Sequence, residues 1–336
     1  MISNSTFNTS LPYGVGDLDP EVVVHLDDPD KVRCYVCGCE HFVRGPQRGK
    51  RGEVCPDHGI YCHHSRYGST YSYADVRRNI IASPEMFAER IVGHPFKYDS
   101  HRLGAENSED ALSWNVFRSL QEFKCLAQVA KLMTNEEHSE EPRLFMWGIR
   151  VDDDSFEPWD LLNAARERFE RNLPVRRPLT EPDIALHLPG KYLILIEAKF
   201  TSLNPVYCRG RRKDAQSLTL SELLEIYLDA SLKIINQSQA SVRNQIHYQL
   251  SRNVVFSEWM AQMDSSSTSP LHINLVRRKS EATSQAEFAG LRHASHAGSF
   301  RRFEWESIGT DNLPSRQLLA RYLLFKTARL LKAFAT

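Results

Sequence analysis

Two short apolar runs joined by turn residues form the clearest pattern in the chain. Residues 184–188 and 192–196 are rich in amino acids that favour β-strands, and Pro189-Gly190-Lys191 between them has turn chemistry. The pattern predicts a β-hairpin. If its turn is centred on Gly190, Asp183 lies opposite Glu197 in the paired strands.

Further apolar periodicities surround this hairpin. Apolar positions at helical spacing predict long helices over residues 110–132 and 241–263, with Ser108 as the N-cap of the first. Residues 144–149 and 271–276 are expected to be strands. The segment 203–237 is a long insertion with a helix over 221–227, and residues 316–334 form an amphipathic C-terminal helix. The order of helices and strands predicts the α/β class.

Three charged residues meet at the end of the predicted hairpin. Opposed side chains in an antiparallel pair lie about 5 Å apart at Cβ, so Asp183 and Glu197 are close. Lys199 shares the face of Glu197 because it lies two residues further along the strand. Buried carboxylates are costly unless compensated, and Mg²⁺ binds few carboxylates together with waters and phosphate oxygens. The alternative is an ordinary Glu–Lys pair on a strand edge.

Such a site suits phosphodiester hydrolysis. The cation would polarise the phosphate and lower the pKa of a bound water, and Lys199 would orient that water or offset the developing charge.

The pattern Pro182-Asp183 followed by Glu197-Ala198-Lys199 resembles the PD-(D/E)xK nuclease superfamily, which includes restriction endonucleases and repair nucleases. The family order of helix, three strands, helix and strand is matched over residues 106–280. The resemblance implies a restriction-endonuclease-like mixed β-sheet flanked by helices. It also implies that Asp183 and Glu197 bind Mg²⁺ or Mn²⁺ and that Lys199 assists catalysis.

Two further family features are expected from the resemblance. An acidic residue on the first helix often supports the metal site, and Glu109 is the better candidate, with Glu106 second; charge complementing the helix dipole is the alternative. Some members carry Gln or Tyr on the helix after the Glu-x-Lys strand, where Gln245, Tyr248 and Gln249 lie, although polar residues on a helix face are the more ordinary interpretation.

Cysteines cluster near the N-terminus, where five of the seven lie between residues 34 and 62. Clustered cysteines in a chain without a signal peptide indicate metal in a reducing cytoplasm rather than disulfides. Two pairs with two intervening residues, as in a zinc ribbon, predict a structural, tetrahedral Zn²⁺ site. Its ligands are Cys34, Cys37, Cys55 and His58.

The fourth zinc ligand is open, because Cys62 or His63 could replace His58. Free buried thiols and an iron–sulfur cluster are alternatives, but a cluster needs four cysteines and the spacing does not suit it. Gly59, after the second pair, suits a tight turn. Cys125 and Cys208 are expected to be ordinary residues.

The overall charge gives no reason to expect non-specific coating of nucleic acid. There are 42 basic and 42 acidic residues, so the net charge is zero. DNA binding would depend on local basic patches at residues 44–51, 209–213, 277–279 and 301–302. Solvated surface is the alternative for each patch.

These observations predict a tail over residues 1–30, a zinc ribbon over 31–66, a connector over 67–105, a nuclease core over 106–280 and an extension over 281–336. The expected function is that of a Mg²⁺-dependent DNA endonuclease of restriction or anti-phage defence type. The partners would be DNA, a second copy of the chain and a defence-system protein, without a membrane. A nucleic-acid-binding adaptor on a non-catalytic scaffold and a junction nuclease are the alternatives.

Overall fold

The computed structural model describes residues 43–44, 53–55, 59–63, 70–73, 75–92, 94, 103–152, 156–171, 179–201, 204, 206–208, 245–278, 300–308, 319 and 322–323. The chain divides into two compact units. Unit 1 comprises Met1–Phe123 with Ile308–Thr336, and unit 2 comprises Lys124–Ser307. The predicted segment boundaries stay predictions, and the helix expected over 221–227 lies outside the described residues.

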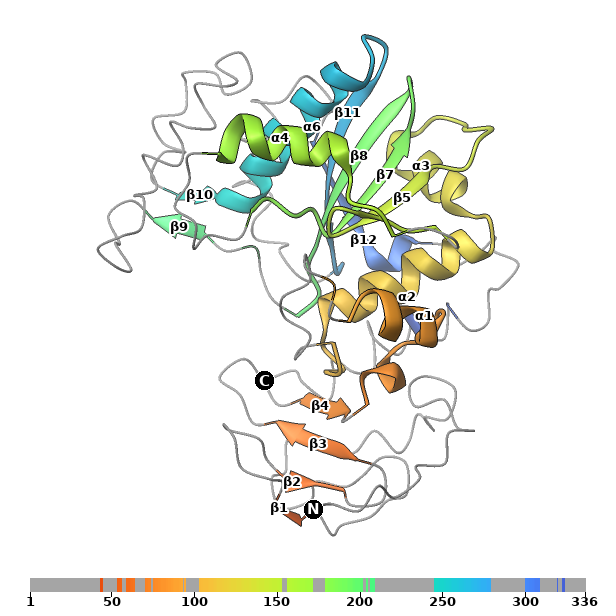
Figure 1. Ribbon diagram of the computed structural model, residues 1–336, viewed down its shortest axis with the longest axis vertical. Coiled ribbons are helices and arrows are strands. Elements are labelled where there is room, and N and C mark those ends of the chain that lie inside the picture. The colour runs from red at the N-terminus through yellow and green to blue at the C-terminus, as the bar shows by residue number, and fades with distance from the viewer. Residues whose placement is uncertain are drawn as a thin grey trace. The chain divides into compact units, whose positions relative to one another are not determined.

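Unit 2 contains a mixed six-stranded sheet with the order β12-β11-β8-β7-β5-β6 (Figure 1). Four strands at one side, β6, β5, β7 and β8, pair antiparallel, whereas β8, β11 and β12 run parallel. The predicted α/β class with a mixed sheet is therefore confirmed. The strands are β5 (Arg143–Met146), β6 (Ile149–Arg150), β7 (Ile184–Leu188), β8 (Tyr192–Ala198), β11 (Ser269–Val276) and β12 (Phe300–Glu304).

The predicted hairpin is formed by β7 and β8. Ile184 pairs with Ile196 and Leu188 with Tyr192, so paired numbers are centred on Gly190 as expected. Gly190 has φ of +69°, and the N–H of Lys191 donates to the carbonyl of Leu188 at 2.9 Å. A three-residue loop with glycine in the left-handed region is a common hairpin connection. The register predicted from the sequence is thus confirmed.

Residues 144–149 do not form one strand as expected. The chain reverses at Trp147-Gly148, where φ is +53° and +79°, and continues as β6. Positive φ at both central residues is the signature of a type I′ turn, whose twist matches the flanking strands. Leu144, Met146, Trp147 and Ile149 are all buried, and the run is apolar throughout. Its sequence pattern therefore gave no sign of the turn.

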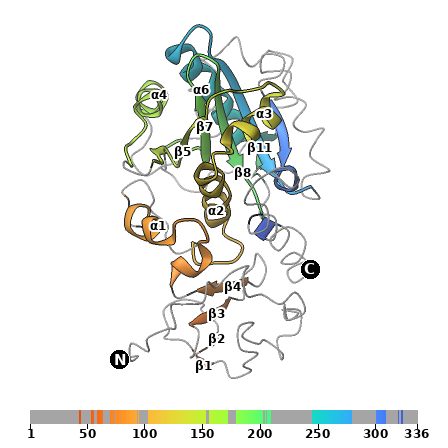
Figure 2. The same cartoon turned by 90° about the vertical axis from the view of Figure 1, so that its right-hand side faces the viewer.

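Three helices of unit 2 accompany the sheet: α3 (Leu126–Thr134), α4 (Asp160–Glu170) and α6 (Tyr248–Asp264). Helices α4 and α6 lie together against one face, while α3 lies on the side away from α4 (Figures 1 and 2). Apolar side chains of β5, β7, β8, α4 and α6 form one buried cluster. Leu193 and Leu195 belong to this cluster, and Glu197 lies two residues after Leu195, so it shares their face and also faces α6.

The helix expected over residues 110–132 is two helices. The first, α2 (Glu109–Glu122), ends before Lys124, which has φ of +54°, and α3 follows. The predicted N-cap is confirmed, since Ser108 Oγ accepts from the N–H of Ala111 at 3.1 Å. The N-terminus of α3 is capped by a residue from later in the chain, because Glu141 accepts from the N–H of Leu126 at 3.0 Å.

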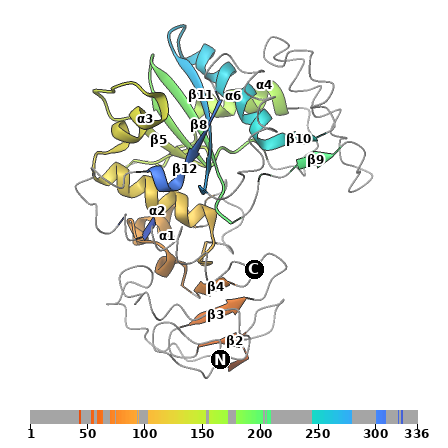
Figure 3. The same ribbon diagram turned by 180° about the vertical axis from the view of Figure 1, so that it is seen from behind.

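The helix expected over residues 241–263 begins later. Residues Gln245–His247 form β10, which pairs with β9 (Val206–Cys208), and α6 starts at Tyr248. Strands β9 and β10 pair antiparallel, with Gln245 opposite Cys208 (Figure 3). The strand expected over 271–276 is confirmed as β11, which pairs parallel to β8.

Among the described residues of unit 1 are a four-stranded antiparallel sheet, a 3-10 helix and the helices α1 and α2. Its elements are β1 (Val43–Arg44), β2 (Glu53–Val54), β3 (Ile60–His63), β4 (Thr70–Tyr73), η2 (Val76–Asn79), α1 (Pro84–Arg90) and α2. Asn115 of α2 donates to Tyr322 Oη at 2.8 Å. Leu319, Tyr322 and Leu323 are helical and buried, at the spacing expected of the predicted amphipathic C-terminal helix; the other residues of the segment 316–334 lie outside the described residues.

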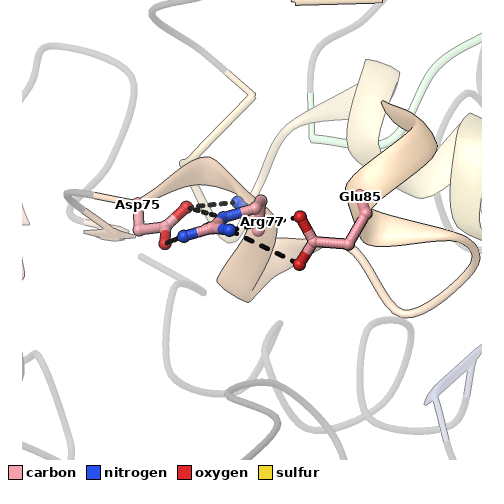
Figure 4. Close-up of polar contacts among 3 residues, drawn as sticks. All are labelled: Asp75, Arg77 and Glu85. Atoms are coloured by element: carbon pink, nitrogen blue, oxygen red, sulfur yellow. Dashed lines mark hydrogen bonds and ion pairs between the residues drawn. The ribbon is translucent and has the colours of Figure 1, made fainter. Parts of the chain in front are cut away.

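An arginine joins the first helical turns of unit 1. The guanidinium of Arg77 lies between two carboxylates, 2.6 Å from Asp75 Oδ2 and 3.2 Å from Glu85 Oε2 (Figure 4). Hydrogen bonding from Arg77 holds the pKa of Asp75 below its ordinary value, although partial burial opposes this. The ion pairs link η2 to the first turn of α1.

Candidate functional site

The β7–β8 hairpin brings the predicted acidic pair to one end of the sheet. Continuing the observed register by one residue places Asp183 opposite Glu197, so their side chains share a face. Asp183 Oδ2 accepts from the N–H of Ala198 at 2.8 Å. Asp183 therefore caps the end of the hairpin, and it is partly exposed while Glu197 is buried.

Glu197 and Lys199 form a buried ion pair. Lys199 Nζ lies 2.7 Å from Glu197 Oε1, and the two residues are 7% and 2% exposed. Removing both charges from water is costly, and their attraction repays this only with good geometry and further hydrogen bonds. A pair this deeply buried does not fit the alternative of an ordinary pair on an exposed strand edge.

The additional hydrogen bond comes from α6. Asn253 Nδ2 donates to Glu197 Oε2 at 2.9 Å, and Asn253 is completely buried. Each oxygen of Glu197 thus accepts a hydrogen bond, Oε1 from Lys199 and Oε2 from Asn253. Asn253 was not expected from the sequence. The sequence feature that could have indicated Asn253 is a polar residue among apolar positions of α6, such as Leu250 and Val254, which are buried.

Two buried polar residues of β11 also lie on this face. His272 pairs with Leu195 and Asn274 pairs with Glu197 in the parallel ladder, and paired residues share a face. Asn274 Oδ1 accepts from Asn204 Nδ2 at 2.9 Å. The alternation of polar and apolar residues in β11 is typical of a strand with one solvated face, yet here both faces are buried.

His272 is neutral at ordinary pH. Complete burial lowers its pKa to about 4, although the charge of Glu197 and a hydrogen bond to Leu195 act in the opposite direction. Its Nδ1 lies 3.0 Å from the Leu195 carbonyl oxygen, which can only accept, so Nδ1 carries the proton. Its Nε2 has no partner among the described residues.

A clamp on α4 holds the chain just before Asp183. Arg166 Nε donates to the carbonyl of Thr180 at 2.8 Å, and Glu170 Oε2 accepts from the N–H of Thr180 at 2.8 Å. The Thr180 hydroxyl also donates to Glu170. Arg166, Glu170 and Thr180 are buried, so this clamp fixes the path that leads into β7.

At Lys199 the backbone is held by β11 and by the residue that follows β12. The N–H of Lys199 donates to the carbonyl of Leu275 at 2.8 Å, and Trp305 Nε1 donates to the carbonyl of Lys199 at 3.0 Å. Arg277 lies over the ring of Phe200, 6.0 Å from its centroid. The backbone on both sides of Glu197 is therefore tied to the sheet.

Two predicted basic patches come together at β11 and β12 but are partly neutralised. Arg278 Nε lies 2.8 Å from Glu304 Oε2, and Arg302 Nη1 lies 2.7 Å from Glu304 Oε1. These arginines hold the pKa of Glu304 below its ordinary value, although partial burial opposes this. Patch 209–213 lies outside the described residues, as does Lys279; of patch 44–51 only Arg44 is described, as part of β1.

The other predicted site residues are distributed as follows. Glu109 and Glu106 belong to unit 1; Glu109 starts α2, and the buried Glu106 accepts a hydrogen bond from Tyr73 Oη. The support of Glu109 for the site stays a prediction. Gln245 lies in β10 rather than on the helix, while Tyr248 and Gln249 open α6.

Of the four predicted zinc ligands, Cys55 alone lies among the described residues. Cys55 is buried, and its carbonyl accepts from the N–H of Gly59, which has φ of +62°. Cys34, Cys37 and His58 lie outside the described residues. Cys62 and His63 are part of β3. The zinc site stays a prediction. Burial raises the pKa of the Cys125 thiol, as suits an ordinary buried residue.

Comparisons with known proteins add no relatives. No protein-family model, curated protein or solved structure matches the chain. Among the described residues, no group of three or more His, Cys, Asp and Glu side chains is placed to hold a metal ion. None of the helices in the described part of the chain is long and apolar enough to cross a membrane.

Proposed function

We propose that the protein is a Mg²⁺- or Mn²⁺-dependent endonuclease that hydrolyses phosphodiester bonds in DNA, with a restriction-endonuclease-like core. The observation that carries this proposal is the hairpin register, which opposes Asp183 to Glu197 and leaves Lys199 bonded to Glu197. Defence against foreign DNA, cytoplasmic location and a structural zinc ribbon are parts of the same proposal.

The residues present suit a cation with few protein ligands. Mg²⁺ commonly takes one or two carboxylates and completes its shell with water and phosphate oxygens. A carboxylate has about four lone-pair sites, and Glu197 uses one on each oxygen for Lys199 and Asn253. Asp183 and Glu197 would hold the cation, which when bound polarises the phosphate and acidifies a water.

The chain's own groups supply the remaining chemistry. Hydrolysis adds a water oxygen to phosphorus and breaks the bond to the leaving oxygen, so negative charge builds on the phosphoryl oxygens. Lys199 Nζ carries three donors, and its buried position strengthens the stabilisation of such charge. Asp183, partly exposed at the end of the hairpin, is where solvent and substrate reach the site.

Nicking of supercoiled plasmid with Mg²⁺ tests the proposal. Asp183→Ala and Lys199→Ala are each expected to lower the rate by about 10²–10³-fold, as for loss of one transition-state stabilising group. Glu167→Gln and Lys191→Ala change exposed residues of unit 2 and serve as matched controls. Equal cleavage by all five proteins would refute the assignment of these residues.

A non-catalytic, nucleic-acid-binding adaptor is the second candidate function. The observation that favours it is the occupation of both Glu197 oxygens by Lys199 and Asn253, which completes the ion pair without a cation. Calorimetric titration with Mn²⁺ discriminates the two. Binding that Asp183→Ala abolishes supports the nuclease, and its absence in the unaltered protein supports the adaptor.

The choice of substrate and assembly is part of the nuclease proposal. Cleavage of branched against linear DNA separates a junction nuclease from a restriction-type enzyme. Cutting both strands of a duplex usually needs two active sites, so a homodimer is part of the proposal, and sedimentation equilibrium measures it directly.

A further inference from the structure

Asn253 is a completely buried polar residue of α6. It lies between Arg252 and Val254, on a helix that also buries the polar side chains of Ser257 and Glu258. Its Nδ2 donates to Glu197 Oε2 at 2.9 Å, whereas its Oδ1 has no partner among the described residues. The side chain therefore makes one strong hydrogen bond and leaves one acceptor unsatisfied.

The direction of the carboxamide follows from electrostatics. Turning Oδ1 toward the Glu197 carboxylate would oppose two acceptors, so only Nδ2 can face Glu197. Leaving Oδ1 buried without a donor costs free energy that an apolar side chain of the same size would not incur. A local rule broken in this way points to a functional site rather than to packing.

The two hydrogen bonds on Glu197 come from different elements. Lys199 of the same chain segment holds Oε1 at 2.7 Å, and Asn253 of α6 holds Oε2 at 2.9 Å. Two contacts on the two oxygens set the plane of the carboxylate and prevent its rotation. The acceptor directions that remain on Glu197 are therefore fixed before any ligand arrives.

We propose that Asn253 is a positioning residue that orients Glu197 for binding a divalent cation. This inference rests on the proposed function, because it assigns Glu197 as a cation ligand. Outer partners of metal-binding side chains typically contribute about 10–100-fold in metal affinity. Asn253 acts through Glu197 and contributes no contact to the substrate.

Calorimetric titration of the full chain with Mn²⁺ tests this role. Asn253→Leu keeps the volume and removes the donor, and it is expected to weaken Mn²⁺ binding about 10–100-fold. Asn253→Gln keeps a carboxamide donor and is expected to restore most of the affinity. Ser257→Ala, one turn further along α6, removes a buried hydroxyl bonded to the Val254 carbonyl and serves as the control.

The midpoint of urea unfolding, measured on each protein, separates positioning from folding. Asn253→Leu is expected to unfold at a lower urea midpoint than the wild type, because the buried Glu197 Oε2 loses its donor, and to remain folded under the conditions of the titration. Weaker binding in a folded Asn253→Leu, with recovery in Asn253→Gln, supports the inference. If Asn253→Leu does not fold, the same comparison is made with Asn253→Gln and Asn253→Ser, which differ in reach to Glu197.

The result that overturns the inference differs from the one that overturns the proposed function. The positioning role is refuted if Asn253→Leu binds Mn²⁺ with wild-type affinity, or loses no more affinity than Ser257→Ala does. In that case Asp183→Ala still abolishes Mn²⁺ binding, so the proposed cation site stands. Titrations in which the unaltered protein and Asp183→Ala give the same heats remove the cation site, and with it both proposals.

Discussion

Replacing Gly148 by alanine tests the turn that joins β5 and β6. Gly148 has φ of +79°, and a residue with a Cβ pays about 1–2 kcal/mol in this region. The added Cβ would also lie 2.8 Å from Leu162 Cδ2 and 3.3 Å from Arg166 Nη2. Overpacking of this kind costs about 1–3 kcal/mol, so the expected loss of unfolding free energy is about 2–5 kcal/mol.

Gly190→Ala is the matched control for the backbone term. Gly190 has φ of +69°, but a Cβ there would meet only Ser267 Oγ, at 3.9 Å, which is ordinary contact. Its expected cost is therefore the backbone term alone, about 1–2 kcal/mol. The difference between the two variants isolates the clash with α4.

Urea unfolding followed by tryptophan fluorescence measures these costs, because a lower midpoint at unchanged slope reports stability. A double-mutant cycle with Leu162→Ala adds a sharper criterion: removing the Leu162 side chain relieves the closest contact, so the double variant should be less destabilised than the sum of the singles. Equal midpoints for Gly148→Ala and Gly190→Ala, or a cycle without coupling, would refute the packing argument.

Three further substitutions test other parts of the molecule. Ser108→Ala should lower the unfolding free energy by about 1 kcal/mol through loss of the α2 cap, and a urea midpoint equal to wild type would contradict this. Burial lowers the pKa of His272 from 6.5 to about 4, so between pH 6.5 and 4 the imidazole binds a proton in the unfolded chain but not in the folded one. The unfolding free energy should therefore fall by about 3 kcal/mol from pH 6.5 to 4, and it should fall less steeply in His272→Asn. Thr180→Val removes the hydroxyl that donates to buried Glu170 and should cost about 1–3 kcal/mol, measured by thermal unfolding, with an unchanged midpoint arguing against the clamp.

The hairpin and its charged residues could be predicted because the information is local. Strand-forming runs, a Pro-Gly turn and the two-residue repeat of a strand determine the register of β7 against β8, and the observed pairs agree. The same repeat places Lys199 on the face of Glu197, and the 2.7 Å contact shows them together. No contact distant in the chain was needed for this step.

The helix boundaries were predicted less well because distant residues set them. The break between α2 and α3 depends on Glu141, which accepts from the N–H groups of Leu126 and Ala127 and so replaces the missing cap. The start of α6 depends on β9, which takes residues 245–247 into a strand. Local periodicity contains neither partner.

The sequence by itself determined the pairing register of the hairpin and hence the convergence of Asp183, Glu197 and Lys199, since each follows from spacing along the chain. Only the tertiary structure decided that Glu197 is buried and that Asn253 and His272 surround it. The reason is physical: burial depends on which face of β8 receives α6, and that choice is made by packing between segments far apart in sequence.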